Sequence, residues 1–509
     1  MAAPFTSSLL LAHLLLAAGA RVRLLEARQD PREPGSLEGR AYALGLGIRG
    51  RTAIRAAGEK LWDAIKPSGF ASERFKLHIA PELAIDLRSP EDNKGLEPSL
   101  LIYQSDLCSA MLDELEANQG SGRLEVSFQS SLESVDPTAG TAKIKAGDQL
   151  QEVSVDLIAG CDGVNSAVRS SIAAACPAFE VEEAKLPGRF KVLRFPRMPK
   201  SLDAAAVHAI GGPGGSSAFV EPTAGGACAL INFKEGGRKP EGLPGLWELK
   251  DAPQARETLA AYFPLIEDAL DEEAAQQFVS QKVGVETDVF GTFCTFGMQP
   301  EFANSQHLRL SVFRSAGSHA ALVQVGSAVL LGDAAHSTGG ASGQGCNSAL
   351  QDLATSGHRG KVRGAQGTGI YLGAVPRGPG LAAAVLCRPR NRLLLQVCEQ
   401  DPRGQAQGAD CVPEALERYS QRQVPEGHAL LDLSLGPGDS AGPIRKALYG
   451  LASLAGTLLS KLGVAEPPLQ TLLTTNLMPF SEIRRNQNFY FGDFPTEEEF
   501  NAVIQKTSH

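Results

Sequence analysis

The chain has 509 residues, more than one hydrophobic core usually organises, so two closely packed domains are expected. Apolar residues make up 43% and charged residues 21% of the sequence, which is ordinary for a globular protein. The net charge of -9 argues against a nucleic-acid partner, because binding to phosphates requires a basic surface.

No apolar run reaches the ~18 residues of a transmembrane helix, so no clear membrane span is predicted. The nine cysteines are scattered, without a Cys-x-x-Cys pair or a cluster with histidine. This pattern indicates reduced thiols in an intracellular, reducing compartment and predicts no metal site.

The N-terminus predicts a helix, a glycine and a short strand. Residues 9–18 are apolar, Gly19 follows, and residues 21–26 are typical of a strand that ends on Glu26. This order is typical of the second half of a βαβ dinucleotide-binding unit. The alternative is the apolar core of a targeting signal, but the basic residues that normally precede such a core are absent.

Further elements follow in chain order. Helices are predicted over residues 49–65 and 105–115, and strands over 124–128, 142–145 and 153–159. From residue 186 to 330, glycine- and proline-rich turns separate short β-like runs, which is typical of a mainly antiparallel sheet. These runs are residues 190–195, 227–233 and 308–313. A buried strand returns at 326–331, so the first domain is expected to be discontinuous.

Residues 353–410 differ from both flanks. By count, this segment contains ten glycines, eight basic and three acidic residues, and it has no helical period. A helix begins at residue 345 before it, and another runs over 413–419 after it. A structureless segment of this length is unusual inside a compact domain. It is either a surface insertion or translated non-coding sequence, and we favour the second and expect the segment to be dispensable.

The C-terminus carries a capping box, in which Thr496 and Glu499 can satisfy each other's backbone N–H groups. This pattern predicts a last helix of about 10 residues.

The strongest chemical motif is Gly-Asp-Ala-Ala-His at 332–336, followed by Gly-Gln-Gly-Cys-Asn at 343–347. The first follows a buried strand and places Asp333 at the strand's carboxyl end, where α/β sheets bind ligands. The second opens a helix, whose free N–H groups and dipole favour an electron-rich ligand.

This pair of motifs resembles the second flavin motif of the class A FAD-dependent aromatic hydroxylases. The resemblance implies that Asp333 contacts the ribityl chain of FAD. It also implies that the helix start holds the pyrimidine end of the flavin and stabilises negative charge on it. The residues concerned there are Gly343, Gly345, Cys346 and Asn347.

Two more segments fit the same family. Residues 156–169 resemble its Asp-Gly motif, which implies that Asp162 lies near the pyrophosphate and assists both FAD and NADPH. Glu26, with Arg28, Arg40 and Gly45 after it, resembles the segment that binds the adenosine ribose. Residues 39–57 and 424–434 resemble kynurenine 3-monooxygenases in particular.

Other positions depart from the family. The Gly-x-Gly-x-x-Gly fingerprint should fall at Ala3, Phe5 and Ser8, and neither the glycines nor the strand before them are present. A side chain at the second position blocks close approach of the backbone to pyrophosphate. As written, the chain is therefore expected to bind FAD poorly, and a misplaced start codon is the simplest explanation.

Further departures concern the flavin and the substrate. Gly340 replaces a proline, Ser105 replaces an arginine that contacts the flavin, and residues 436–438 replace a Tyr-Asn-Tyr. No arginine clearly matches the one that binds the substrate carboxylate. These departures argue against kynurenine itself as the substrate.

The resemblance implies an α/β fold, with a Rossmann-like FAD-binding domain and an inserted, mainly antiparallel substrate sheet. Glu26, Asp162 and Asp333 should lie on a parallel sheet around one cleft. The expected ranges are 1–180 and 321–352 for the FAD-binding domain, 181–320 for the sheet, 353–410 for the atypical segment and 411–509 for a helical C-terminal region.

The implied reaction is hydroxylation of a small aromatic molecule by O2, with NADPH as reductant and a flavin C4a-hydroperoxide as oxidant. NADPH would dock transiently. The flavin carries the chemistry, so no catalytic side chain is expected. The alternatives are a flavoprotein reductase or halogenase of the same fold, or a flavin-free relic.

Overall fold

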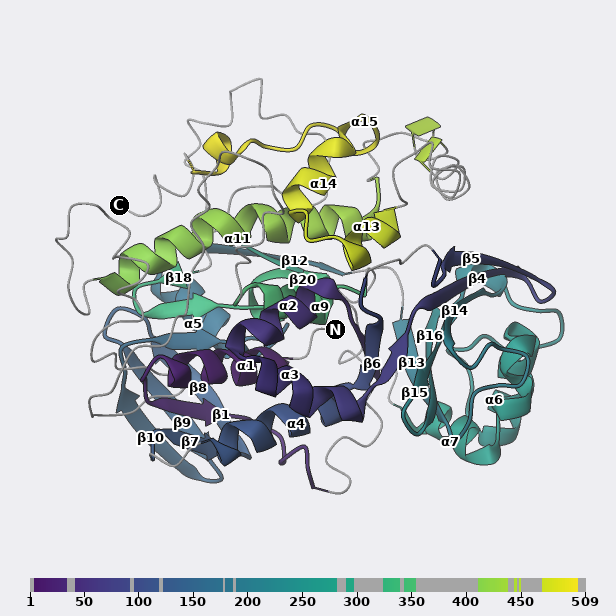
Figure 1. The fold of residues 1–509 in the computed structure, drawn as a ribbon, viewed down its shortest axis with the longest axis horizontal. Helices are drawn as coiled ribbons and strands as arrows, with labels where there is room; N and C mark the ends of the chain where they lie inside the picture. The colour runs from purple at the N-terminus through teal and green to yellow at the C-terminus, as the bar shows by residue number, and fades with distance from the viewer. Residues whose placement is uncertain are drawn as a thin grey trace.

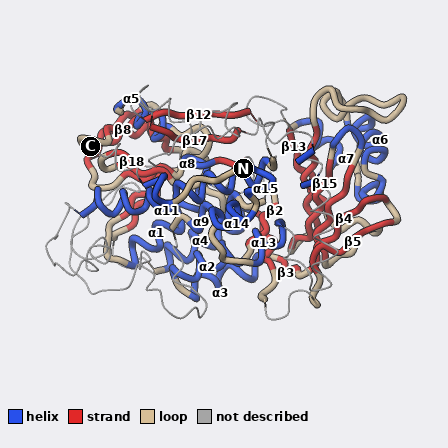
Figure 2. Tube along the Cα trace, turned by 90° about the horizontal axis from the view of Figure 1, so that it is seen from above, coloured by secondary structure: helices blue, strands red, loops and turns tan. Residues whose placement is uncertain are grey.

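The computed structural model describes residues 4–33, 42–91, 96–118, 122–176, 179–185, 189–281, 290–296, 324–338, 343–353, 411–437, 444–445, 448–449 and 469–501. It is a mixed α/β structure, in which a six-stranded sheet with two covering helices lies at one end (Figure 1). The tube view shows the same division (Figure 2).

The larger part of the molecule begins with α1 (Pro4–Ala17) and β1 (Val22–Leu25). After them come β2 (Ala43–Leu46), α2 (Ile48–Ala57), α3 (Glu59–Ile65), β3 (Phe70–Ser72), β6 (Ser99–Tyr103), α4 (Gln104–Ala117), β7 (Leu124–Ser127), β8 (Ser130–Asp136), β9 (Thr141–Ala146), β10 (Gln149–Ser154), β11 (Ile158–Gly160) and α5 (Ala167–Ala175). The predicted order of helix, glycine and strand at the N-terminus is confirmed, and Gly19 has the positive φ of 87° that favours glycine.

The six-stranded sheet has the order β13-β16-β15-β14-β4-β5. Its elements and covering helices are β4 (Arg74–Ala80), β5 (Leu83–Arg88), β13 (Arg189–Phe195), β14 (Ala206–Gly211), β15 (Ser217–Thr223), β16 (Gly226–Phe233), α6 (Ala252–Tyr262) and α7 (Glu272–Ser280). The predicted strands 190–195 and 227–233 are confirmed, and the sheet is antiparallel except where β14 pairs with β4. Strands β4 and β5 come from far earlier in the chain than the predicted range 181–320.

The remaining elements return to the larger part. They are β12 (Phe179–Lys185), β17 (Phe290–Phe296), β18 (Gln324–Val325), β19 (Ala328–Leu330), α8 (Asp333–His336), β20 (Ser337–Thr338), α9 (Gly345–Gln351), α11 (Cys411–Leu435), α13 (Leu469–Thr475), α14 (Phe480–Asn486) and α15 (Asn488–Phe491). No helix within the described ranges is both long and apolar enough to cross a membrane.

Two predicted elements are wrong in extent. The helix expected over 49–65 is divided at Gly58, whose φ of 143° and ψ of 142° are not helical. The strand expected over 153–159 is divided because the chain changes sheets there. Strand β10 pairs with β9, whereas β11 pairs in parallel with β19.

The single parallel sheet expected to carry Glu26, Asp162 and Asp333 is also not formed. Among the described residues, β1 pairs in parallel with β7, and β11 with β19, in separate sheets. Helix α1 contacts both β1 and α9, and its apolar side chains join the main core. Side-chain packing, rather than strand pairing, therefore connects these two sheets.

The atypical segment lies outside the described residues, apart from Leu353, so its dispensability stays a prediction. The predicted strand 308–313 lies outside them too. At the C-terminus the capping box is confirmed, because Thr496 N–H donates to Glu499 Oε2 at 2.8 Å and Glu499 N–H donates to Thr496 Oγ1 at 3.2 Å. The helix after it is described over residues 497–501.

Buried charges fasten the C-terminal helices to α11. Arg484 Nε of α14 donates to Asp432 Oδ2 of α11 at 2.7 Å, and the two side chains are 1% and 6% exposed. Glu426, also on α11, accepts hydrogen bonds from Phe480 N–H and from the N–H and hydroxyl of Ser481 at the start of α14.

We expect Asp432→Ala to lower the free energy of unfolding by about 3 kcal/mol, because it leaves the Arg484 guanidinium buried without its carboxylate. Urea denaturation measures this change. The control is Asp268→Ala, which removes the partly exposed ion pair with Arg197 and should change stability by less than about 1 kcal/mol. Equal effects of the two substitutions would contradict the role given to the buried pair.

Candidate flavin-binding site

The loop that carries Asp333 is held by its own backbone. Gly332 has a φ of 58°, and a Cβ there would lie 3.0 Å from the Cβ of Ala349, so the position requires glycine. Its N–H donates to Asp352 Oδ2 at 2.8 Å. Asp333 begins α8 directly after this turn and is 8% exposed. Asp333 therefore lies at the carboxyl end of the strand, as predicted, and its contact with a ligand stays a prediction.

The same Asp352 also fixes the far end of α8. His336 Nε2 lies 2.9 Å from Asp352 Oδ2, and both side chains are almost buried. Burial alone would lower the pKa of His336, but the neighbouring Asp352 carboxylate outweighs it and the pKa is raised. One carboxylate on α9 thus fixes both ends of the Asp333 loop.

The start of α9 presents backbone donors. The first bond of this helix runs from Ser348 N–H to Gln344 O at 2.8 Å, so the N–H groups of residues 345–347 have no partner within the helix. Gly343 precedes them with a φ of 65°. Cys346 is 3% exposed, and burial raises the pKa of its thiol, so it remains a neutral thiol.

Asn347 connects this helix to the turn between β2 and α2. Its Oδ1 accepts from Gly47 N–H at 2.9 Å and from Gly50 N–H at 3.3 Å, and its Nδ2 donates to Gly45 O at 2.8 Å. A Cβ on Gly50 would lie 2.6 Å from Asn347 Oδ1. This contact brings Gly45 to the motif. The side-chain role of Asn347 was not predicted, although the paired glycines at the start of α2 were a signal for it.

The Asp162 motif joins the same region through Arg169. Asp162 accepts from Ser166 Oγ at 2.5 Å and from Val168 N–H at 3.2 Å, which shapes the start of α5. Arg169 is 4% exposed and donates to Ala334 O at 3.1 Å, next to Asp333. The two motifs, far apart in sequence, are therefore in direct contact.

Glu26 lies at the end of β1 and is already hydrogen-bonded. Its carboxylate accepts from the N–H, Nε and Nη2 of Arg28 at 2.9, 2.8 and 3.0 Å. The hydrogen bonds with Glu26 raise the pKa of Arg28. A ribose would therefore have to share this carboxylate with Arg28. Arg40 lies outside the described residues.

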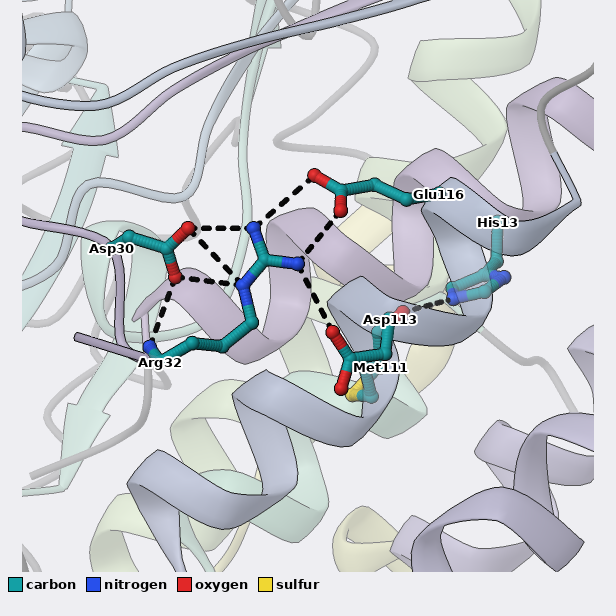
Figure 3. Close-up of polar contacts among 6 residues, drawn as sticks. All are labelled: His13, Asp30, Arg32, Met111, Asp113 and Glu116. Carbon is teal, nitrogen blue, oxygen red and sulfur yellow. Dashed lines mark hydrogen bonds and ion pairs between the residues drawn. The ribbon is translucent and has the colours of Figure 1, made fainter.

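The loop after β1 is anchored to α4 by a second arginine (Figure 3). Arg32 donates to Asp30 at 2.6 Å, to Asp113 at 3.0 Å and to Glu116 at 2.7 Å. These carboxylates raise the pKa of Arg32. Nearby, His13 Nε2 of α1 lies 2.9 Å from Met111 O of α4. Both contacts hold the elements around Glu26 in place.

The residues at the expected fingerprint positions are packed as core. Phe5 is 3% exposed and its ring contacts Phe128, while Ser8 Oγ donates to Phe5 O. Ser7 Oγ is buried, has no hydrogen-bond partner among the described residues and lies 3.5 Å from an added Cβ on Gly332. The groups around Asp333 and α9 fit a flavin, whereas α1 presents side chains where the family has glycines. Ala3 lies outside the described residues.

Arg49 is a further buried residue that sequence reasoning did not single out. It is 1% exposed, and it donates to Gln351 Oε1 at 3.1 Å and to Met478 O at 2.5 Å. Its guanidinium also lies 4.0 Å from the Phe480 ring centre. Burial lowers the pKa of Arg49 to about 10. This side chain fastens α2 to α9 and to the C-terminal helices.

We expect Asn347→Leu to lower the free energy of unfolding by about 1–3 kcal/mol, since the N–H groups of Gly47 and Gly50 and the Gly45 carbonyl lose their partner in a buried place. Chemical denaturation measures this. Asn232→Leu, which removes only a 3.5 Å contact to Ser217, is the control and should have a smaller effect. A stable Asn347→Leu protein would contradict the account.

The ion pair of His336 predicts a pH dependence. Because the folded-state pKa is raised, the stabilisation is fully present below the unfolded-state pKa and is lost as pH rises through the folded-state value. His336→Asn should therefore lower the melting temperature more at about pH 5.5 than at about pH 8.5. A difference from wild type that does not change with pH would show that the charge is unimportant.

Comparison with known proteins identifies the family. The family model described as "FAD binding domain" matches residues 7–235 and 295–358, which is more than half of the chain. A kynurenine 3-monooxygenase of Xanthomonas campestris is 28% identical over 349 residues, covering 67% of each chain. One of Salinispora tropica is 27% identical over 354 residues, covering 67% of this chain and 68% of the relative.

Solved structures agree in fold. The tetrameric form of 2-methyl-3-hydroxypyridine-5-carboxylic acid oxygenase superposes with a TM-score of 0.56 at 18% identity, covering 89% of this chain and 92% of that one. A mutant of P. aeruginosa PqsL gives 0.52 at 16% identity, covering 84% and 92%. The α/β fold with a flavin-hydroxylase architecture is thereby confirmed, and the chain belongs to the FAD-binding domain family, among the FAD-dependent monooxygenases.

Proposed function

We propose that this chain hydroxylates a small aromatic molecule with O2, using FAD as the bound cofactor and NADPH as the reductant. One observation carries the proposal. Asp333, the start of α9, the β2–α2 turn and the Asp162 motif converge through the hydrogen bonds of Asn347 and Arg169. The names of the relatives support the kind of reaction, and the departures at substrate positions argue for a substrate other than kynurenine.

Each group has a role in this proposal. The Asp333 carboxylate would accept hydrogen bonds from the ribityl hydroxyls, and the N–H groups of residues 345–347 would meet the pyrimidine edge, where the helix dipole favours negative charge. Asp162 would lie near the pyrophosphate. Gly45, held by Asn347, would let the backbone approach the ring closely. Glu26, shared with Arg28, would bind the adenosine ribose.

When bound, FAD would supply the redox chemistry, in which NADPH provides two electrons, one oxygen atom of O2 enters the electron-rich ring and the other leaves as water. The protein's own task is to position the ring and exclude water. The six-stranded sheet is suited to this, since Phe190, Val192 and Cys228 on one face pack against Ala43 of β2. We therefore assign residues 1–180 and 321–352 to the FAD-binding domain and 181–320 to the sheet domain, except that β4 and β5 join the sheet, whereas β12 and β17 pair within the larger part.

A specific observation also favours a second candidate, a flavin-free protein that keeps the fold. Phe5 fills core space at an expected glycine position, and Glu26 already accepts three hydrogen bonds from Arg28. In such a protein the polar groups around Asp333 would hold the fold together without a cofactor. FAD binding separates the two candidates directly.

We expect Asp333→Ala to weaken FAD binding at least about tenfold, because a carboxylate hydrogen-bonded to hydroxyls contributes more than about 1.4 kcal/mol. Titration of the purified protein, followed by flavin fluorescence, measures the dissociation constant. Asp148→Ala, in an exposed turn, is the control and should bind FAD as the wild type does. A folded wild type that retains no flavin would support the flavin-free candidate.

A further inference from the structure

The face of the six-stranded sheet that meets the rest of the molecule carries one carboxylate. Along β15, Ala218 and Val220 join the core formed with α6 and α7. Because side chains alternate along a strand, Phe219 and Glu221 point to the opposite face. Phe219 confirms this by its contact with Phe75 of β4, with ring centres 6.4 Å apart. Glu221 thus faces away from the helices that cover the sheet.

Glu221 lies at the contact between the sheet and β2. It is in register with Cys228 of β16, which is in turn in register with Arg194 of β13. Cys228 belongs to a small apolar cluster with Ala43 of β2, and Tyr42 packs against this cluster. Strand β6, beside the sheet in Figure 1, contacts β15 as well.

The same place borders the flavin motifs. The pKa of Tyr42 is raised, mainly by burial. The nearby groups of Cys346, Asp333, Cys108 and Glu221 raise it further. Tyr42 therefore lies within electrostatic range of both Asp333 and Glu221. Three residues after Tyr42, the Gly45 carbonyl of β2 accepts the hydrogen bond of Asn347.

The Glu221 carboxylate has no partner in the described part of the chain. The side chain is partly buried, and this burial raises the pKa of the carboxyl group to about 7. The charged Arg194 side chain at the end of this row is exposed and lies 4.8 Å from the Tyr103 ring centre. A partly desolvated carboxylate without a donor is unfavourable, so a ligand that donates a hydrogen bond to Glu221 would bind favourably here.

We propose that Glu221 is a specificity-determining residue that accepts a hydrogen bond from a ring-attached amine or hydroxyl of the aromatic substrate. This inference rests on the proposed function, since it places the substrate ring between the sheet face and the flavin motifs. It narrows the substrate class to aromatic rings that carry such a donor. With an apolar residue at this position, the site would bind rings with and without such a donor equally well.

The test compares two probes of nearly equal shape, 2-aminobenzoate and 2-methylbenzoate, whose methyl group has no N–H. Isothermal titration of the full chain, with and without FAD, gives both dissociation constants. The wild type should prefer the amino probe at least about tenfold, as one good hydrogen bond to a charged group allows. Glu221→Leu should reduce this preference to about threefold or less, and Glu221→Gln should keep part of it because its carbonyl still accepts.

Two controls sharpen the result. Glu257→Gln, on the exposed side of α6, should leave the preference unchanged. The wild-type preference should grow as pH rises through about 7, where Glu221 ionises, while that of Glu221→Gln should stay constant. Tyr42, Tyr103 and Cys228 face the same place but should remain neutral through this range, since their pKa values are raised.

Each outcome decides between the claims. A preference that survives in Glu221→Leu, or a wild type that binds neither probe, overturns the assignment of Glu221. A wild type that binds no FAD but shows the Glu221-dependent preference contradicts the proposed function and supports this assignment. A wild type that binds FAD but shows no preference between the two probes supports the proposed function and contradicts the assignment of Glu221.

Discussion

The hydrogen bonds of the Asn347 side chain are the constraint on which the site depends. The carboxamide of Asn347, which is 1% exposed, satisfies the N–H groups of Gly47 and Gly50 and the carbonyl of Gly45, between β2 and the start of α2. Gly50 must be glycine for this contact to form, because a Cβ would collide with the amide oxygen. The start of α9 is therefore fixed against β2, whose Ala43 packs against the six-stranded sheet.

Buried charges extend this framework outward. Asp352 holds both ends of the Asp333 loop, Arg169 ties that loop to α5, and Arg49 joins α2 to the C-terminal helices. Buried ionic groups are stabilising only when they are well paired, and each of these makes good hydrogen bonds. Such groups also define a unique geometry, which is what positioning an oxygen-transfer reaction requires.

Much of the fold was readable from local sequence. The order of helix, glycine and strand, the Asp333 motif and the capping box at Thr496 each express a rule that acts within a few residues. The side-chain partners of Asn347 and Arg49 were not predictable, because they lie about 300 residues away in the sequence. The pairing of β4 with β14 was missed for the same reason, since strand pairing over long separations leaves no local pattern. Gly58 was a local signal for the end of a helix, but the helical spacing of apolar residues on both sides of it led to the prediction of one continuous helix.

The central claim is that a flavin ring binds between the start of α9 and the face of the sheet that carries Glu221. A crystal structure of the chain soaked with FAD tests this most directly. The account predicts the ribityl hydroxyls on Asp333, the pyrimidine edge on the N–H groups of residues 345–347, and Glu221 on the far side of Tyr42 facing the ring. A flavin bound elsewhere, or clear density for this region without any flavin at saturating FAD, would contradict it.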